Sequence, residues 1–163
     1  MACLPKPLMA RWKTESKDGT LAMKTFVRLA DVAAHERDLS WQRDARVVLE
    51  KLKECASLCQ DVVDDVCVWL ERERRREPTA STVCVAVVVE ALAHEASLRE
   101  QMVHSLTGVH DADGYHACLT AWKLNPFLNS PAVERALREM QFHEERLHRL
   151  EVLERHGTPS KTK

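Results

Sequence analysis

Glycine, proline and aromatic residues are scarce in this sequence of 163 residues, which has four glycines, six prolines and a single tyrosine. A fold of many short strands joined by tight turns needs more glycine and proline than this. Acidic and basic residues nearly cancel, and the formal net charge is −1. No uninterrupted apolar run approaches the roughly 18 residues of a membrane-spanning helix. These absences predict a helical protein with no membrane association and no general affinity for nucleic acids.

The N-terminus and the cysteines indicate a reducing compartment. Residues 1–11 contain two prolines and no apolar stretch of signal-peptide length. Of six cysteines, Cys55, Cys59 and Cys67 fall within one predicted helix, where thiols four residues apart are poorly placed for a disulfide. We therefore expect reduced thiols and a cytoplasmic protein, with the nucleus as an alternative location.

A seven-residue apolar repeat dominates residues 41–77. Three series of apolar residues spaced by seven run through this segment: Trp41, Val48, Cys55, Val62, Trp69; Ala45, Leu52, Cys59, Val66; Leu49, Ala56, Val63, Leu70. Three apolar positions in every seven give the wide stripe of a bundle helix, whereas a two-stranded coiled coil needs only two. At 1.5 Å per residue this helix would be about 55 Å long. A compact sphere of this chain would be only about 40 Å across, so the bundle is expected to be elongated.

The remaining predicted helices follow from apolar spacing and helix-start signals. They cover about 20–38, 80–106, 115–122 and 131–156. Ser130 followed by Pro131 is a strong start signal for the last of them. The predicted fold is therefore all-α: an elongated up-and-down bundle of four long helices and one short helix.

Three segments of different character are expected along the chain. They are an irregular N-terminal arm over 1–19, a single helical-bundle domain over 20–156 and a disordered C-terminal tail over 157–163. The arm is predicted because Pro5 and Pro7 oppose a helix and because Asp18-Gly19 is a turn signal. The tail is polar and contains a proline.

Apolar side chains in the two predicted irregular segments are candidates for partner binding. Leu8, Met9 and Trp12 are too apolar for a free tail. They either fold back on the bundle or bind a partner or a second copy. Trp122 and Phe127 belong to the apolar loop segment 122–128 before the last helix. They too either pack on the bundle or bind a partner.

A dense basic cluster ends the longest predicted helix. Its members are Arg72, Arg74, Arg75 and Arg76, interleaved with three glutamates. Because no aromatic residues separate the arginines and the glutamates nearly neutralise them, a solvated helix end explains the cluster. An electrostatic contact with an acidic partner is the alternative.

Thiols and imidazoles on the predicted apolar stripes form a candidate metal site. Cys55 and Cys59 lie on the stripe of 41–77, and His94 and His143 lie between apolar residues on two other predicted helices. Cysteine and histidine side chains bind zinc and copper. The alternative is that the thiols are ordinary small core residues and the histidines lie at the edge of the core.

Templates for catalysis and for common metal centres fail. Neither Gly-x-Ser-x-Gly nor a glycine-rich phosphate loop occurs. A helical metalloprotease motif starting at His143 would need histidine where Leu147 stands. An EF-hand loop starting at Asp111 would need glycine and glutamate where His116 and Trp122 stand.

The leading hypothesis is a non-enzymatic helical bundle that acts as an adaptor, scaffold or regulatory protein. It would bind another protein or self-associate, without a cofactor. The candidate partner-binding residues are Leu8, Met9, Trp12, Arg72, Arg74, Arg75, Arg76, Trp122 and Phe127. The alternative hypothesis is a metal-binding bundle that holds zinc or copper through Cys55, Cys59, His94 and His143.

Overall fold

The computed structural model describes residues 4–35, 41–76, 80–106 and 112–156, and within these ranges it contains helices and no strands. The helices are α1 (Lys6–His35), α2 (Trp41–Arg76), α3 (Ala80–Ser105), α4 (Ala112–Leu124) and α5 (Pro131–His156). The all-α prediction is confirmed. The predicted disordered tail lies outside the described residues. In the described part of the chain, no helix is both long enough and apolar enough to span a membrane.

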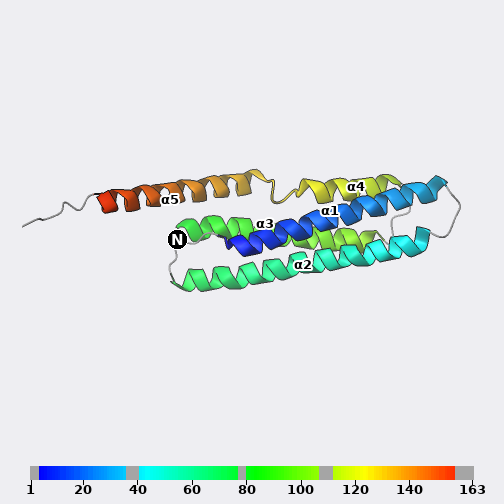
Figure 1. Ribbon diagram of the computed structural model, residues 1–163, viewed down its shortest axis with the longest axis horizontal. Coiled ribbons are helices and arrows are strands. Elements are labelled where there is room, and N and C mark those ends of the chain that lie inside the picture. The colour runs from blue at the N-terminus through cyan, green and yellow to red at the C-terminus, as the bar shows by residue number, and fades with distance from the viewer. Residues whose placement is uncertain (1–3, 36–40, 77–79, 107–111, 157–163) are drawn as a thin grey trace, which may run out of the picture.

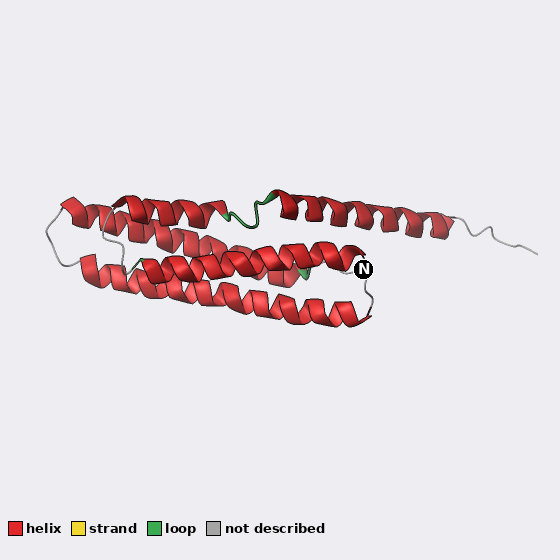
Figure 2. Cartoon of the chain, turned by 180° about the vertical axis from the view of Figure 1, so that it is seen from behind, coloured by secondary structure: helices red, strands yellow, loops and turns green. Residues whose placement is uncertain are grey.

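The first three helices run up, down and up beside one another, and α4 and α5 follow end to end along the fourth side (Figure 1). The reverse view shows the same alignment of α4 and α5 (Figure 2). α4 packs mainly on α1, whereas α5 packs on α3. The fourth position of the bundle therefore changes its supporting helix at the connection between α4 and α5. α2 has 36 residues, about 54 Å at 1.5 Å per residue, and the bundle is elongated as predicted.

The start of α1 corrects the predicted irregular arm, because residues 6–19 are helical. Pro7 lies in the first helical turn, where the missing N–H would have no partner and the fixed φ suits a helix. Pro5 precedes the helix, and its carbonyl oxygen accepts a hydrogen bond from the Met9 N–H at 3.1 Å. Both prolines are therefore compatible with a helix that begins at Lys6.

Gly19 was predicted to lie in a turn, but it is buried inside α1. A Cβ atom at Gly19 would overlap the indole ring of Trp122, which belongs to α4. Glycine is unfavourable within a helix by about 1 kcal/mol relative to alanine. It is accommodated here because it lets the backbone of α1 approach the indole directly.

The ends of α4 and α5 follow local sequence signals. Asn125 has a φ of 44°, the left-handed conformation in which asparagine commonly ends a helix. The Ser130 hydroxyl accepts a hydrogen bond from the Val133 N–H at 3.4 Å, and the Ser130 carbonyl oxygen accepts one from the Glu134 N–H at 3.1 Å. The predicted cap at Ser130 and start at Pro131 are confirmed.

The buried core divides into two parts along the bundle. We call them the α5-side core and the α4-side core, after the helix that covers each. The α5-side core includes Trp12, Cys59, Val62, Val66, Val85, Val88, Leu92, Val133, Ala136 and Met140. The α4-side core includes Met23, Phe26, Leu52, Ala56, Met102, Val103, Leu119 and Trp122. The division lies at the same level as the break between α4 and α5.

Candidate functional site

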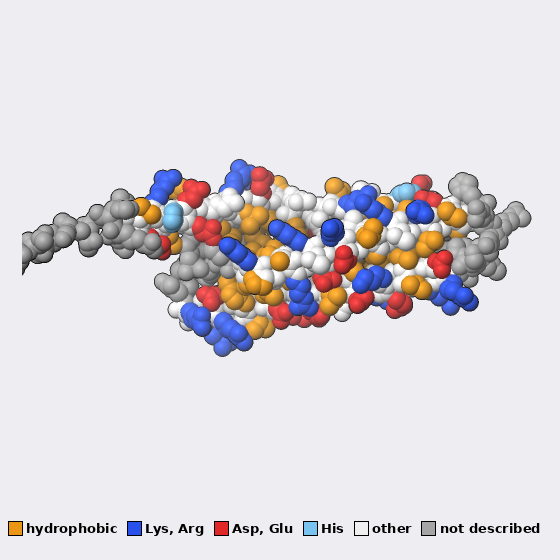
Figure 3. All heavy atoms as spheres, in the orientation of Figure 1, with side chains coloured by type: hydrophobic (Ala, Val, Ile, Leu, Met, Phe, Trp, Pro, Cys, Tyr) orange, Lys and Arg blue, Asp and Glu red, His pale blue; other side chains and the backbone are white. Residues whose placement is uncertain are grey.

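An open groove lies between α1 and α5. It begins at the helix break, beyond which α5 packs on α3 and no longer covers α1. Met9 and Trp12 of α1 line one wall, Leu128 and Leu137 line the other, and Val88 of α3 also lines the groove. Its volume is about 410 Å³. Figure 3 shows hydrophobic side chains gathered in this hollow, with basic side chains beside it. We call this feature the α1/α5 groove.

The α1/α5 groove combines an apolar lining with a basic side. Lys13 and Lys17, one helical turn apart on α1, line it together with the apolar residues. Ser16 and Asn125 contribute polar groups at the level of the helix break. Such a surface suits an amphipathic segment that carries acidic residues beside an apolar face.

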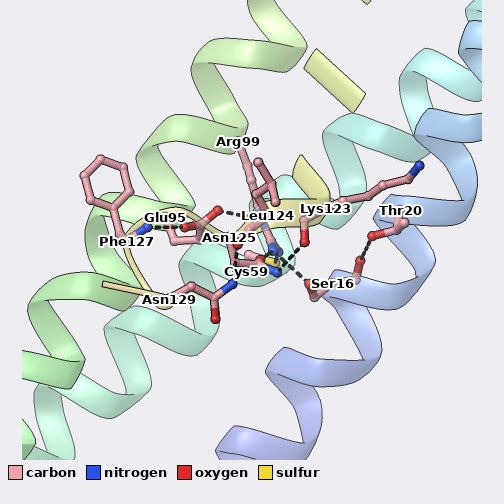
Figure 4. Close-up of polar contacts among 10 residues, drawn as sticks. All are labelled: Ser16, Thr20, Cys59, Glu95, Arg99, Lys123, Leu124, Asn125, Phe127 and Asn129. Atoms are coloured by element: carbon pink, nitrogen blue, oxygen red, sulfur yellow. Dashed lines mark hydrogen bonds and ion pairs between the residues drawn. The ribbon is translucent and has the colours of Figure 1, made fainter. Parts of the chain in front are cut away.

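A buried arginine lies beside this groove and connects the helices around the break (Figure 4). Arg99 of α3 is fully buried, and its guanidinium donates hydrogen bonds to Cys59 Sγ of α2 at 3.1 Å and to Ser16 Oγ of α1 at 2.8 Å. It also donates to the side-chain oxygen of Asn125. One guanidinium therefore joins α1, α2, α3 and the α4–α5 connection.

Two indole rings complete the surroundings of Arg99. Its Cζ lies 4.8 Å from the ring centre of Trp12 and 5.1 Å from that of Trp122. Desolvated cation–π contacts of this kind contribute about 2 kcal/mol. Trp12 belongs to the α5-side core and Trp122 to the α4-side core, so Arg99 lies at the junction of the two.

Glu95 is the second fully buried charged residue of α3. Its Oε2 accepts a hydrogen bond from the Phe127 N–H at 3.2 Å, and its Oε1 lies 3.9 Å from Arg99 Nε. Burial raises the pKa of the Glu95 carboxyl, while the Phe127 N–H and Arg99 oppose that shift. Glu95 thus fixes the start of the α4–α5 connection against α3.

The raised pKa of Glu95 predicts a pH dependence of stability. The folded chain retains the Glu95 proton to a higher pH than the unfolded chain, in which the pKa is about 4.5. The stability linked to this group is therefore complete below pH 4.5 and is lost as pH rises through the higher pKa of the folded state. Urea unfolding of the native chain and of Glu95→Gln across this range tests the sign. The free-energy difference, native minus variant, should fall as pH rises, and a rising difference would contradict the prediction.

Trp12 and Trp122 are buried in the core, which agrees with the first of their two interpretations, packing on the bundle. Leu8 and Met9 are half-buried and pack against the α5-side core. The first segment thus packs on the bundle, as a helix. Phe127 remains partly exposed, with its ring 5.2 Å from that of His94.

The four arginines near the end of α2 are exposed. Arg74 pairs with Glu71 at 3.9 Å, and Arg76 pairs with Glu73 at 3.4 Å, each within the same helix. Arg72 and Arg75 are the other two members of the cluster. Exposed pairs of this kind contribute little to stability, and their geometry matches a solvated helix end.

The proposed metal ligands are not gathered into one site. Cys55 and Cys59 are fully buried, whereas His94 is exposed and His143 is half-buried. Among the described residues, no three side chains of His, Cys, Asp or Glu lie close enough together to hold a metal ion. Burial also raises the pKa of both thiols.

Glu95 and Arg99 were missed because the apolar stripe of α3 was assigned one residue off. His94 was expected on that stripe, but the next residue, Glu95, faces the core. Around this position the buried side chains of α3 are Ala91, Leu92, Glu95, Ala96, Arg99, Met102 and Val103. Two opposite charges four residues apart on such a stripe are a readable signal of a buried pair.

Comparison with protein-family models, with curated protein sequences and with solved structures gives no match for this chain. The α1/α5 groove combines a volume, an apolar lining and a basic side next to the buried Arg99.

Proposed function

We propose that this protein is a non-enzymatic interaction module that binds an amphipathic helix of a partner in the α1/α5 groove. The observation that carries the proposal is the change of support in the fourth position of the bundle. α5 packs on α3 and leaves the neighbouring side of α1 uncovered. A helix placed there would complete the packing around the N-terminal half of α1.

The chemistry of the groove supports a helical and partly acidic occupant. Apolar anchors spaced three and four residues apart are the usual way in which a helix fills such a groove. Met9, Leu128 and Leu137 offer apolar contacts to those anchors, and Lys13 and Lys17 favour acidic residues on one flank. Arg99 holds α1 and the α4–α5 connection in place beside the groove, so the site is largely formed before binding.

Replacing Leu137 with glutamate should weaken helix binding at least tenfold. Leu137 is 41% exposed, so the change places a charge in the groove with little disturbance of the core. Leu124→Glu is the matched control, because Leu124 is also exposed and does not line the groove. The measurement selects binders from a displayed library of 16-residue amphipathic helices and compares their Kd values for the three proteins. Binders that tolerate Leu137→Glu as well as Leu124→Glu would contradict the proposed site.

A further inference from the structure

α5 continues well past the end of the bundle (Figures 1 and 2). From residue 141 to residue 152 every side chain is exposed except that of His143, which is half-buried. We call residues 141–156 the α5 extension. Its 16 residues correspond to about 24 Å of helix at 1.5 Å per residue.

The α5 extension carries the same apolar seam that holds α5 on the bundle. Val133, Ala136 and Met140 are buried in the α5-side core, at spacings of three and four residues. The same spacing continues through His143, Leu147 and Leu150. Leu147 is 43% exposed and Leu150 is 48% exposed. A packing seam of this kind normally faces a second helix over its whole length.

The length of the α1/α5 groove matches that of the extension. The groove-lining residues of the N-terminal segment run from Leu4, two residues before α1 begins, to Thr20 in α1. At 1.5 Å per residue this segment also spans about 24 Å. Within the described ranges, the groove has no helix packed in it, and the apolar seam of the α5 extension has no helix packed against it. One chain cannot satisfy both, because its extension points away from its own groove (Figure 1).

We propose that two copies of this chain form a symmetric dimer in which each α5 extension occupies the α1/α5 groove of the other copy. This inference rests on the proposed function and names its partner. The two α5 helices run antiparallel, and one twofold axis relates both contacts, so the assembly closes at two copies. Each extension lies between α1 and α5 of its partner, with its seam facing α3.

The alignment of the two antiparallel α5 helices is set by where the groove ends, at the connection between α4 and α5. When residue 156 of one extension lies level with residue 128 of the other chain, Leu147 lies level with Leu137. The incoming helix then runs parallel to α1. The apolar seam thus meets the apolar wall of the groove.

The oligomeric state of the full chain tests this proposal directly. Sedimentation velocity should give a species of twice the 18.6 kDa chain mass. Leu147→Glu should raise the dimer dissociation constant at least tenfold, while Leu124→Glu leaves it unchanged. The helical circular dichroism signal should be the same in all three proteins, because both leucines lie on the surface.

Cross-linking tests the register. Leu137→Cys mixed with Leu147→Cys should give a disulfide-linked dimer under mild oxidation, and neither variant alone should give it to the same extent. A native chain that stays monomeric at 100 µM, or about 10⁻⁴ M, where weak complexes still form, would overturn the dimer. So would a dimer that is insensitive to Leu147→Glu. Either result leaves helix binding in the groove to be judged separately by the Leu137→Glu comparison.

Discussion

Replacement of Arg99 by alanine is expected to lower the free energy of unfolding by about 3–5 kcal/mol. The change removes the donor that Cys59, Ser16 and Asn125 share. It also leaves the carboxyl of Glu95 in the core without its neighbouring positive charge. Guanidinium chloride unfolding at pH 7, followed by circular dichroism, measures the loss.

Two comparison variants separate the buried charge from general packing. Arg138→Ala removes an exposed arginine that pairs with Glu134 at 2.6 Å, and it should change stability little. Replacing Arg99 with methionine and Glu95 with glutamine together should cost less than Arg99→Ala, because no ionisable side chain is left buried without its partner. A loss below about 1 kcal/mol in Arg99→Ala would show that the guanidinium is not a major stabilising group.

Gly19→Ala is expected to destabilise the chain by about 1–3 kcal/mol, against the helix preference that favours alanine. In an exposed helix this change is stabilising by about 1 kcal/mol. Here the new Cβ would overlap the indole of Trp122, which is fully buried and has little room to move. The overlap should therefore outweigh the gain in helix propensity. Thermal and denaturant unfolding of Gly19→Ala show whether the change in unfolding free energy is a loss or a gain.

A double-variant cycle with Trp122→Leu identifies the cause. Leucine is smaller than the indole, so Trp122→Leu should itself be destabilising by cavity formation. In that background the added methyl group at Gly19 has space, and Gly19→Ala should become neutral or stabilising. An equal loss in both backgrounds would mean that the contact with Trp122 does not explain the glycine.

Much of the fold could be predicted from the sequence because the strongest signals are local. The seven-residue repeat defines α2, and the pair Ser130-Pro131 fixes the start of α5. The N-terminal half of α1 could not be predicted in the same way. Pro7 opposes a helix in general but not in the first turn, and Gly19 signals a turn unless a neighbour fills the space beside it. That neighbour, Trp122, is distant in the sequence.

The candidate site was only partly accessible to sequence reasoning. Met9 and Trp12 were singled out for their apolar character, and both line the α1/α5 groove, although Trp12 is buried. The buried Glu95–Arg99 pair can be predicted only if the buried face of α3 is placed correctly. An error of one residue rotates that face by about 100°, and it puts His94 in the core in place of Glu95. The groove itself depends on which helix supports α5, and no local pattern encodes that choice.

The divided support of the fourth helical position also shapes how the molecule can open. α4 is held mainly by α1 and α5 mainly by α3, so detachment of one does not require detachment of the other. Proteins open in cooperative units whose boundaries follow such divisions in packing. Asn125 to Ser130 forms the joint between the two units. Arg99, which bonds to Asn125 and contacts an indole from each part of the core, connects the two units.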